Sequence, residues 1–416
     1  MTDEKQRQTI GDYFTLQRGT TYKSKLLGQP GRLLLGLLTI QRNGGFRSDS
    51  LQTYGGESPP KLLVQPGELY VSLKDVTQSA DLLGAVARLP SGFAAGRLTQ
   101  DTVRLAPKSR DVPLDYLYWL LRTPQYRAYC RAHATGTTNL GLSRGDFLAY
   151  PAPEPTSTQI MLAEALGTLD DKIELNKQMC KTLEAIGKAI FKHWFIDFEF
   201  PNEEGRPYKS SGGEMVYNEE LEKEIPKGWE ISNVNKEFNL VMGQSPPGSS
   251  YNETGEGVVF FQGRTDFGHR FPSIRMFCTE PTRFAKKGDT LISVRAPVGD
   301  ANLALQDCCI GRGLAAIRHK SDYSSYTYYL MMTLKPTFDH FEAQGTVFGS
   351  LSKADFEKIK VLAPSKEIIN RFQNTVGSID KKIEDNTLQT LTLSSIRDSL
   401  LPKLMSGRIR VPVKVR

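Results

Sequence analysis

The sequence predicts an α+β protein in which two pseudo-two-fold related α/β domains are separated by a pair of long antiparallel coiled-coil helices. Three observations predict this fold. A heptad pattern without proline runs through residues 159–197, a similar pattern returns near the C-terminus, and short motifs recur in the same order in both halves. Between the helices, short strand patterns without long crossovers favour antiparallel or mixed sheets.

The first helix carries a seam of residues at alternating spacings of four and three, which is typical of a helix that packs along another helix. The seam consists of Leu162, Leu166, Leu169, Ile173, Asn176, Cys180, Leu183, Gly187, Ile190 and Trp194. The second seam consists of Ile369, Phe372, Val376, Ile379, Ile383, Asn386, Thr390 and Leu393. We expect the two helices to pair with each other through these seams.

We expect the helix pair to be antiparallel, because the second helix begins where the second domain ends and needs only to run back along the first. The linker before the second domain is long enough for a parallel return, which is the alternative. Asn176 and Asn386 hold the same heptad position, where a buried polar side chain can set the register of a helix pair. The alternative is that one or both of them face solvent.

Five motifs recur in the same order, which indicates an internal duplication. The strongest match joins residues 169–176 to residues 379–386. The other matches join residues 14–19 to 238–243, 67–74 to 288–295, 136–147 to 345–356 and 152–153 to 363–364. The duplication predicts a first domain at 1–155, a helix at 156–198, a linker and second domain at 199–363, and a second helix with a tail at 364–416.

Within the domains, local patterns predict the shorter elements. Strands are expected at residues 62–73, 102–105, 258–262 and 289–294, and one helix in each domain at residues 114–121 and 326–334. Residues 201–229 are polar and rich in Gly, Glu and Lys, so we interpret them as a linker between the first helix and the second domain.

The composition suits a polyanionic partner. The chain carries 53 Lys and Arg against 46 Asp and Glu, a formal net charge of +7; many basic proteins nevertheless bind no nucleic acid. The start is polar and the longest strongly apolar run, residues 33–40, is too short to cross a bilayer, so a cytoplasmic location is expected. Five cysteines without a CxxC pair favour buried thiols over disulfides or a zinc site.

Short matches to catalytic motifs fail in their sequence context. Residues 311–316 spell GxGxxA, but no helix is expected after them, as dinucleotide binding requires. Residues 266–268 spell DFG without the other kinase motifs. The five histidines have no neighbour at metal-ligand spacing, so no metal site is expected. The chain is therefore expected to be a binding protein and not an enzyme, with no catalytic residues.

Several loops combine glycine with Arg, Lys, Asn and hydroxyl side chains, which can bind phosphates and base edges of DNA. Such loops are also ordinary turns, which is the alternative for each of them. The candidate DNA contacts are Arg18, Tyr22, Lys23, Arg42, Asn43, Arg47, Lys74, Thr137, Thr138, Asn139, Gln244, Ser245, Arg264, His269, Arg270, Arg295 and Thr346.

These motifs resemble the DNA-specificity subunits of type I restriction–modification systems. The resemblance covers nearly the whole chain and rests on the duplication and on the motifs at residues 192–198, 225–229, 242–247 and 400–407. It implies that each domain is a target-recognition domain for one half of an asymmetric, bipartite DNA site. It also implies that the helices serve as a spacer and as a docking surface.

The resemblance further implies the partners and cofactors. Double-stranded DNA, two DNA methyltransferase subunits and restriction or motor subunits are the expected partners. The methyltransferase would methylate adenine at N6 with S-adenosylmethionine, and the motor subunit would use ATP and Mg, so no cofactor is expected on this chain. A stand-alone bivalent DNA-binding regulator and an unrecognised enzyme are the alternatives.

Overall fold

The computed structural model describes residues 8–137, 139–343 and 349–405. Its contacts divide the chain into two compact units: unit 1 comprises Met1–Leu175 and Gln389–Arg416, and unit 2 comprises Asn176–Leu388. Each unit contains one domain of strands and short helices together with a segment of each long helix. In the described ranges, no helix has both the length and the apolar character that a membrane span requires.

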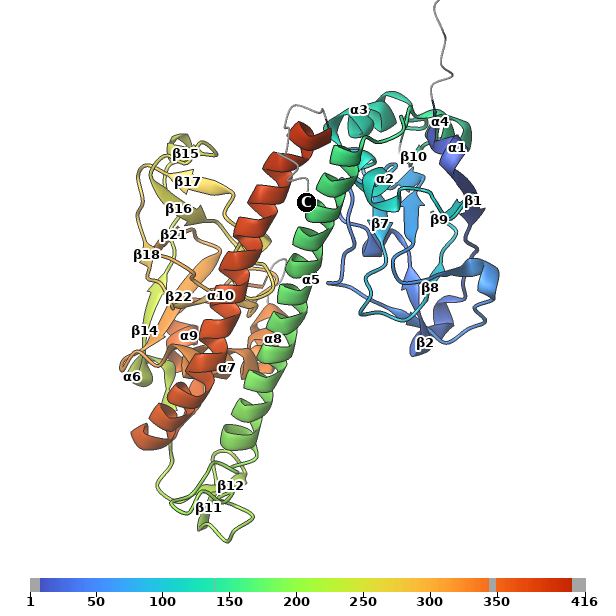
Figure 1. Ribbon diagram of the computed structural model, residues 1–416. Coiled ribbons are helices and arrows are strands. Elements are labelled where there is room, and N and C mark those ends of the chain that lie inside the picture. Colours follow the sequence, from blue (N-terminus) through green and yellow to red (C-terminus); the bar gives the residue numbers. More distant parts are fainter. Residues whose placement is uncertain (1–7, 138, 344–348, 406–416) are drawn as a thin grey trace, which may run out of the picture. The chain divides into compact units, whose positions relative to one another are not determined.

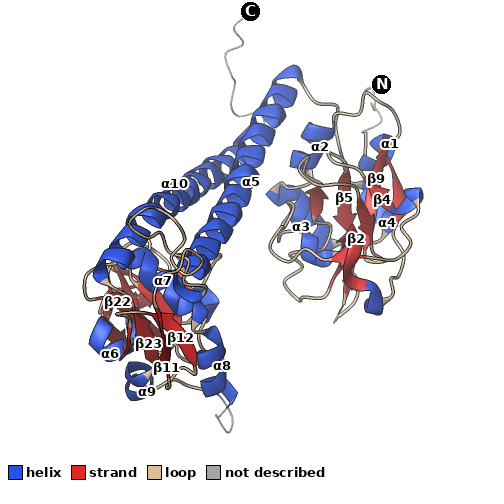
Figure 2. Ribbon diagram, turned by 90° about the horizontal axis from the view of Figure 1, so that it is seen from below, coloured by secondary structure: helices blue, strands red, loops and turns tan. Residues whose placement is uncertain are grey.

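Unit 1 contains two four-stranded sheets. Figure 2 draws their strands in red. The first sheet has the order β1-β9-β5-β7 and is antiparallel throughout. The second has the order β3-β2-β8-β4, with β2 and β8 parallel. A separate short pair joins β6 to β10. The strands are β1 (Phe14–Arg18), β2 (Leu27–Leu35), β3 (Thr53–Tyr54), β4 (Leu63–Val64), β5 (Leu69–Ser72), β6 (Lys74–Asp75), β7 (Val86–Arg88), β8 (Gly96–Leu98), β9 (Thr102–Pro107) and β10 (Leu140–Gly141).

Unit 2 repeats both sheets. Its antiparallel sheet has the order β14-β22-β19-β20, and its mixed sheet has the order β15-β17-β16-β21-β18, with β16 and β21 parallel. Two further pairs join β11 to β12 and β13 to β23. The strands are β11 (Met215–Asn218), β12 (Lys223–Pro226), β13 (Glu230–Asn233), β14 (Phe238–Met242), β15 (Tyr251–Asn252), β16 (Val258–Phe261), β17 (Met276–Cys278), β18 (Phe284–Ala285), β19 (Thr290–Ser293), β20 (Ala301–Leu303), β21 (Cys308–Ile310), β22 (Leu314–His319) and β23 (Lys360–Ala363).

The two antiparallel sheets also agree in register. Leu69 of β5 pairs with Leu105 of β9, and the matching Thr290 of β19 pairs with Ile317 of β22. The same strand order, the same register and a parallel pair at the same place in the second sheet confirm the internal duplication and the mixed α+β class.

Short helices flank the sheets of each unit. In unit 1 they are α1 (Ile10–Tyr13), α2 (Leu114–Leu120), α3 (Pro124–Ala132) and α4 (Arg144–Ala149), with 3₁₀ turns at Ser24–Leu26, Leu37–Thr39 and Pro60–Leu62. In unit 2 they are α6 (Val234–Glu237), α7 (Ser324–Thr333), α8 (Lys335–Ala343) and α9 (Lys353–Lys358), with 3₁₀ turns at Gly248–Ser250 and Arg264–Asp266.

One repeated motif has a clear role at the start of α4 and α9. The Ser143 hydroxyl accepts a hydrogen bond from the Asp146 amide at 3.0 Å, and the Ser352 hydroxyl accepts one from the Asp355 amide at 3.2 Å. Each serine thereby satisfies a free amide in the first turn of its helix.

The two longest helices are α5 (Ser157–Phe191), which continues into a π-helical turn at Lys192–Ile196, and α10 (Lys366–Met405); Figure 1 draws them in green and red. Their contacts run antiparallel within each unit. In unit 2 the Cys180 thiol lies 3.7 Å from the Ile383 carbonyl, and further along α5 the ring of Phe191 lies 5.6 Å from that of Phe372. In unit 1, Asp170 pairs with Arg397, and Leu166, earlier in α5, lies in the same core cluster as Leu401, later in α10. The antiparallel arrangement is confirmed.

Every residue of the two predicted seams is buried or partly buried. In the first seam, Ile173 is 4% exposed, and in the second Val376 and Ile383 are fully buried. Asn176 and Asn386 are 0% and 4% exposed, so neither side chain faces solvent. Their role in setting the register stays a prediction.

Two predictions about elements are corrected. Residues 62–73 do not form one strand, because Gly67 adopts a φ of 85° in a turn between β4 and β5, a conformation that favours glycine. Residues 201–229 are not a bare linker. They form the β11–β12 hairpin, and Ile225 and Trp229 are buried in the core of unit 2 with Phe198 and Phe200.

Candidate nucleic-acid interface

One edge of the antiparallel sheet of unit 1 gathers several candidate DNA contacts. Here β1 ends at Arg18, which pairs with Val103, and β5 ends at Ser72, which pairs with Thr102. The Arg18 Nε donates a hydrogen bond to the Gln100 carbonyl at 3.5 Å. The turn between β8 and β9 therefore lies beside the end of β1.

Lys74 lies at the same edge, two residues after the end of β5. Its Nζ is 3.2 Å from Asp101 Oδ1, in the turn that Arg18 also contacts. Gly141 pairs with Lys74 and Thr135 pairs with Gly141, which brings both residues to this edge, and the nearby side chains of Thr137 and Asn139 are exposed. Cationic, hydroxyl and amide groups at one exposed edge can bind phosphate oxygens and base edges.

The loop at residues 41–47 contacts the segment that leads into β7 at this edge. The Asn43 amide donates to the Asp81 carbonyl at 2.8 Å, and the Arg42 side chain, 78% exposed, lies 3.9 Å from the Asp81 carboxylate. The Asn43 Oδ1 accepts a hydrogen bond from Arg127 at 3.3 Å. Arg42 is thus available to a ligand, whereas Asn43 already serves the fold of its own loop.

The equivalent edge of unit 2 has the same construction. Arg295 follows β19 by two residues, as Lys74 follows β5, and it pairs with Ser350 as Lys74 pairs with Gly141. Gln244 and Ser245 follow β14, and the Ser245 hydroxyl accepts a hydrogen bond from the Arg312 amide at 3.4 Å. The turn that contains Arg312 leads directly into β22, so the GxGxxA string at residues 311–316 runs into a strand and, as expected, opens no helix.

A glycine follows the first strand of the antiparallel sheet in each unit. It allows the chain after that strand to approach the turn before β9 or β22 closely. A Cβ on Gly19 would lie 1.9 Å from the Thr99 carbonyl oxygen, and one on Gly243 would lie 2.2 Å from the Gly311 carbonyl oxygen. No larger residue fits at either position without a backbone shift. The matched glycines of the repeat therefore have a steric cause.

The loop at residues 264–270 carries three candidate DNA contacts, of which two are exposed and one is buried. Arg264 is 56% exposed and its Nε donates to Asp300 at 2.7 Å, much as Arg42 lies near Asp81. His269 is 49% exposed. Arg270 requires a correction, because its side chain is only 2% exposed and lies against Asp380 and two tyrosine rings. It cannot contact DNA from this position.

The remaining candidates are placed as follows. Thr138 and Thr346 lie outside the described residues. Exposed side chains at the predicted positions are those of Arg18, Tyr22, Lys23, Arg42, Asn43, Arg47, Lys74, Thr137, Asn139, Gln244, Arg264, His269 and Arg295, and Ser245 is half-buried. Their contact with DNA stays a prediction.

Sequence reasoning missed two arginines beside these loops. Arg312 is exposed in the turn next to Ser245. Arg97 is 4% exposed, and its guanidinium donates to the Thr20 hydroxyl at 3.1 Å and to the Thr21 carbonyl at 3.0 Å. Arg97 thereby supports the loop that carries Tyr22. The only sequence signal for Arg97 is its place in a short strand between Gly96 and Leu98.

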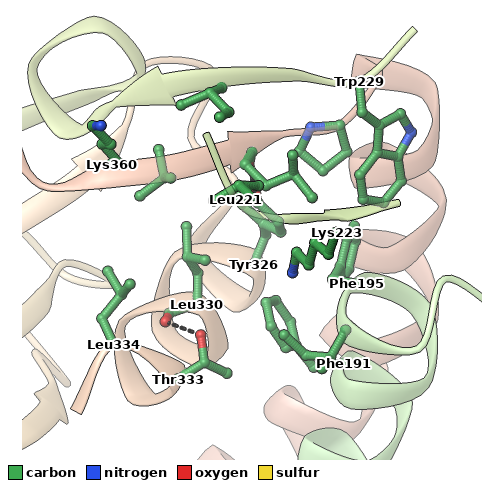
Figure 3. Close-up of a pocket in the computed structure, with 15 residues that line it drawn as sticks. Phe191, Phe195, Leu221, Lys223, Trp229, Tyr326, Leu330, Thr333, Leu334 and Lys360 are labelled. Atoms are coloured by element: carbon green, nitrogen blue, oxygen red, sulfur yellow. Dashed lines mark hydrogen bonds between the residues drawn. The ribbon is translucent and has the colours of Figure 1, made fainter. Parts of the chain in front are cut away.

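Unit 2 also contains an apolar cavity of about 220 Å³ at the end of α5. Figure 3 shows Phe191, Phe195, Trp229 and Tyr326 around it, with Lys223 and Lys360 among its polar lining. The Thr333 hydroxyl donates to the Leu330 carbonyl at 2.7 Å, so it is satisfied within α7. Within the described ranges, no cluster of three or more His, Cys, Asp and Glu is arranged to hold a metal ion.

Comparisons with known proteins agree with this construction. Residues 226–393 match the sequence model of the type I restriction modification DNA specificity domain. The "Putative type I restriction enzyme MjaX specificity subunit" of Methanocaldococcus jannaschii is 32% identical over 315 residues, which are 74% of this chain and 71% of that protein. The HindI specificity subunit of Haemophilus influenzae is 25% identical over 373 residues, 73% of this chain and 79% of that one.

A solved structure shares the fold. The crystal structure of a type I restriction–modification system S subunit from M. genitalium aligns with a TM-score of 0.60 and 17% identity over 97% of this chain and 98% of that one. The sequence matches define the class of protein, a DNA-specificity subunit of a restriction–modification system. The chain belongs to the family of type I restriction–modification specificity subunits. Members of this family are recognition subunits and not catalytic ones, which fits the expectation for this chain.

Proposed function

We propose that this chain recognises an asymmetric, bipartite DNA site and directs adenine-N6 methyltransferase subunits to it. The observation that carries the proposal is the pair of equivalent sheet edges with different side chains. Arg18 and Lys74 lie at one edge, and Met242 and Arg295 occupy the matching positions at the other. Two edges of the same construction suit two half-sites, and different side chains suit different base sequences.

The charge of these edges supports DNA as the ligand. Arg18, Lys74 and Arg42 in unit 1, and Arg295 and Arg312 in unit 2, are exposed at loops where strands begin or end. Cationic side chains supply the phosphate contacts that hold a protein on the duplex, and bidentate contacts to bases discriminate sequences by about 1–3 kcal/mol each.

The long helices support the second part of the proposal, docking of two methyltransferase subunits. Ile186 in α5 and Ile396 in α10 are equivalent in the duplication, and they are 43% and 42% exposed. Exposed apolar side chains at equivalent turns offer the same contact twice, once in each unit. Identical contacts suit two copies of one partner.

The cofactors of the complex belong to the partners in this proposal. The methyltransferase subunits would use S-adenosylmethionine, and a restriction or motor subunit, where one joins the complex, would use ATP and Mg. The chain itself supplies the two recognition domains and the long helices that connect them.

Methylome sequencing of cells that express this chain with its cognate methyltransferase tests the proposal. The expected result is N6-methyladenine at one split motif with two different halves and a fixed gap. A control strain with the methyltransferase alone should lack this motif. Absence of a split motif, despite formation of the complex, would refute the proposal and leave the stand-alone regulator, whose test is a footprint of the chain alone on a promoter.

A further inference from the structure

Each unit connects its recognition domain to a long helix through an aspartate at the same place in the duplication. Asp170 of α5 corresponds to Asp380 of α10. Each lies against an arginine that is stacked on the aromatic side chains of α2 or α7. These two aspartates therefore join elements that are far apart in the sequence.

In unit 1, Asp170 contacts three side chains. Its Oδ2 accepts hydrogen bonds from Arg122 Nη1 at 2.8 Å and from the Tyr118 hydroxyl at 3.3 Å. Its Oδ1 accepts one from Arg397 Nη1 of α10 at 2.5 Å. The Arg122 guanidinium lies 4.4 Å from the ring centre of Trp119, and its side chain is 7% exposed. One carboxylate thus contacts the recognition domain and the second long helix together.

In unit 2, Asp380 has a different set of partners. Arg270 Nη2 lies 2.7 Å from Asp380 Oδ1, which also accepts a hydrogen bond from the Tyr329 hydroxyl at 3.0 Å. The Arg270 guanidinium lies 4.3 Å from the ring centre of Tyr328. Gly187 of α5 stands where the duplication has Arg397, so Asp380 has one arginine partner in place of two.

The pKa values of the two aspartates are shifted in opposite directions, in line with their different numbers of arginine partners. Burial raises the pKa of Asp170, but Arg122 and Arg397 outweigh it and leave that pKa below its ordinary value. Burial also raises the pKa of Asp380, and a single arginine leaves it above its ordinary value. Both carboxylates nevertheless fix a planar guanidinium between a ring and a helix, which restricts rotation and tilt better than apolar packing alone.

We propose that Asp170 and Asp380, with Arg122 and Arg270, are positioning residues that fix the orientation of each recognition domain on its long helix and thereby confine methylation to one gap between the half-sites. The inference rests on the proposed function, because a gap exists only in a bipartite site. Neither aspartate lies at the sheet edges that carry the candidate DNA contacts, so the half-site sequences should not depend on them.

The test uses purified complexes with the cognate methyltransferase. The substrates are duplexes with identical half-sites and gaps from two base pairs shorter to two base pairs longer than the natural one. The variants are Arg270→Lys and Asp380→Glu, which keep the charges but change the geometry, and Arg122→Lys for unit 1. Arg318→Lys is the matched control, since Arg318 pairs with Asp289 inside the same domain and contacts neither long helix in those pairs.

The expected result is a rise of about tenfold in the methylation rate at neighbouring gaps relative to the natural gap, the order expected when one charge-assisted hydrogen bond is lost. The preferred half-sites should remain the same, and the control should retain the selectivity of the parent complex. Unchanged gap selectivity in variants that still methylate would overturn the inference. So would unfolding of both Arg270→Lys and Asp380→Glu in thermal melts, because the residues would then hold the fold instead of setting an orientation. Failure of the parent complex to methylate any split site would instead refute the proposed function.

Discussion

Gly187 of α5 lies directly against Tyr329 of α7: a Cβ on Gly187 would be 2.1 Å from the tyrosine hydroxyl oxygen. The close approach brings this hydroxyl within hydrogen-bond distance of Asp380. A helix glycine costs about 1 kcal/mol relative to alanine, but at position 187 there is no room for a larger side chain unless Tyr329 moves.

The first prediction concerns this glycine. Gly187→Ala should lower the free energy of unfolding of unit 2 by about 1–3 kcal/mol, because the methyl group forces Tyr329 out of place. Gly167→Ala is the control in the same helix, since a Cβ there meets nothing within 4 Å and alanine favours the helix by up to about 1 kcal/mol. Urea unfolding of both variants measures the difference. Equal stabilisation by the two substitutions would contradict the steric explanation.

The second prediction concerns the buried amides of the helix pair. Replacement of Asn176 and Asn386 by leucine should raise the stability of unit 2, because buried polar side chains at a seam cost stability while they specify alignment. Spin labels at the exposed positions 182 and 382 should then show a broader distance distribution. A more stable variant with an equally narrow distribution would show that the asparagines do not set the register.

The third prediction concerns the pH dependence of unit 2. Burial lowers the pKa of His319 below its ordinary value, although Glu237 opposes the shift. The folded state therefore holds His319 neutral, and the unfolded state takes up the proton first as the pH falls through the ordinary histidine range. Stability should decrease between about pH 7.5 and 5.5 for this reason.

His319→Asn provides the comparison. The His319 Nδ1 accepts a hydrogen bond from the Ser321 amide at 3.0 Å, and asparagine retains an acceptor but cannot be protonated. Other charged groups near His319, namely Lys366, Asp322 and Lys320, are present in both proteins. The variant should show a flatter pH profile in urea unfolding. Parallel profiles would exclude His319 as the source of the dependence.

The fourth prediction separates the two sheet edges. Arg295→Ala should weaken DNA binding and relax selection at one half-site only, and Lys74→Ala should do so at the other, because they lie in different units. The expected loss is about 1–3 kcal/mol for a base contact, or a lower salt slope for a phosphate contact. Lys192→Ala, at an exposed ion pair with Asp197, is the control. Equal effects of one variant on both halves would contradict the assignment.

The fifth prediction concerns the partners. Ile186→Asp and Ile396→Asp should each remove one methyltransferase subunit from the complex, and the double variant should remove both, because a charge at an apolar contact is costly. Leu391→Asp is the control: Leu391 is 55% exposed, but its counterpart in the duplication is Lys181. Native mass spectrometry gives the stoichiometry. Retention of two subunits in the double variant would place the docking surface elsewhere.

The helix pair and the duplication could be predicted because they depend on periodicity and on repeated short strings, both of which are local signals. The burial of the Arg270 side chain could not be predicted. Its loop has the same composition as an exposed binding loop, and its burial depends on tyrosines 58 and 59 positions later and on Asp380 in another helix. Partners at such separations produce no recognisable pattern in the sequence of the loop itself.

The prediction of one strand at residues 62–73 was wrong for a different reason. Pro66 and Gly67 gave a turn signal, but the apolar residues on both sides favoured one long strand. The exposed sheet edges could be predicted only in part. Strand ends at Lys74 and Arg295 follow from matched motifs, whereas their proximity to the turns before β9 and β22 arises only when the sheets form.

The division of the chain into units has a consequence for its synthesis. Unit 2 is one continuous stretch, so a ribosome that has delivered Leu388 has delivered all of it. Unit 1 is discontinuous, and its core, which includes Leu166, also contains Leu401 from the far end of α10. The domain made first is therefore completed last, and the earlier half of the protein must wait for the final helix before its apolar surface is covered.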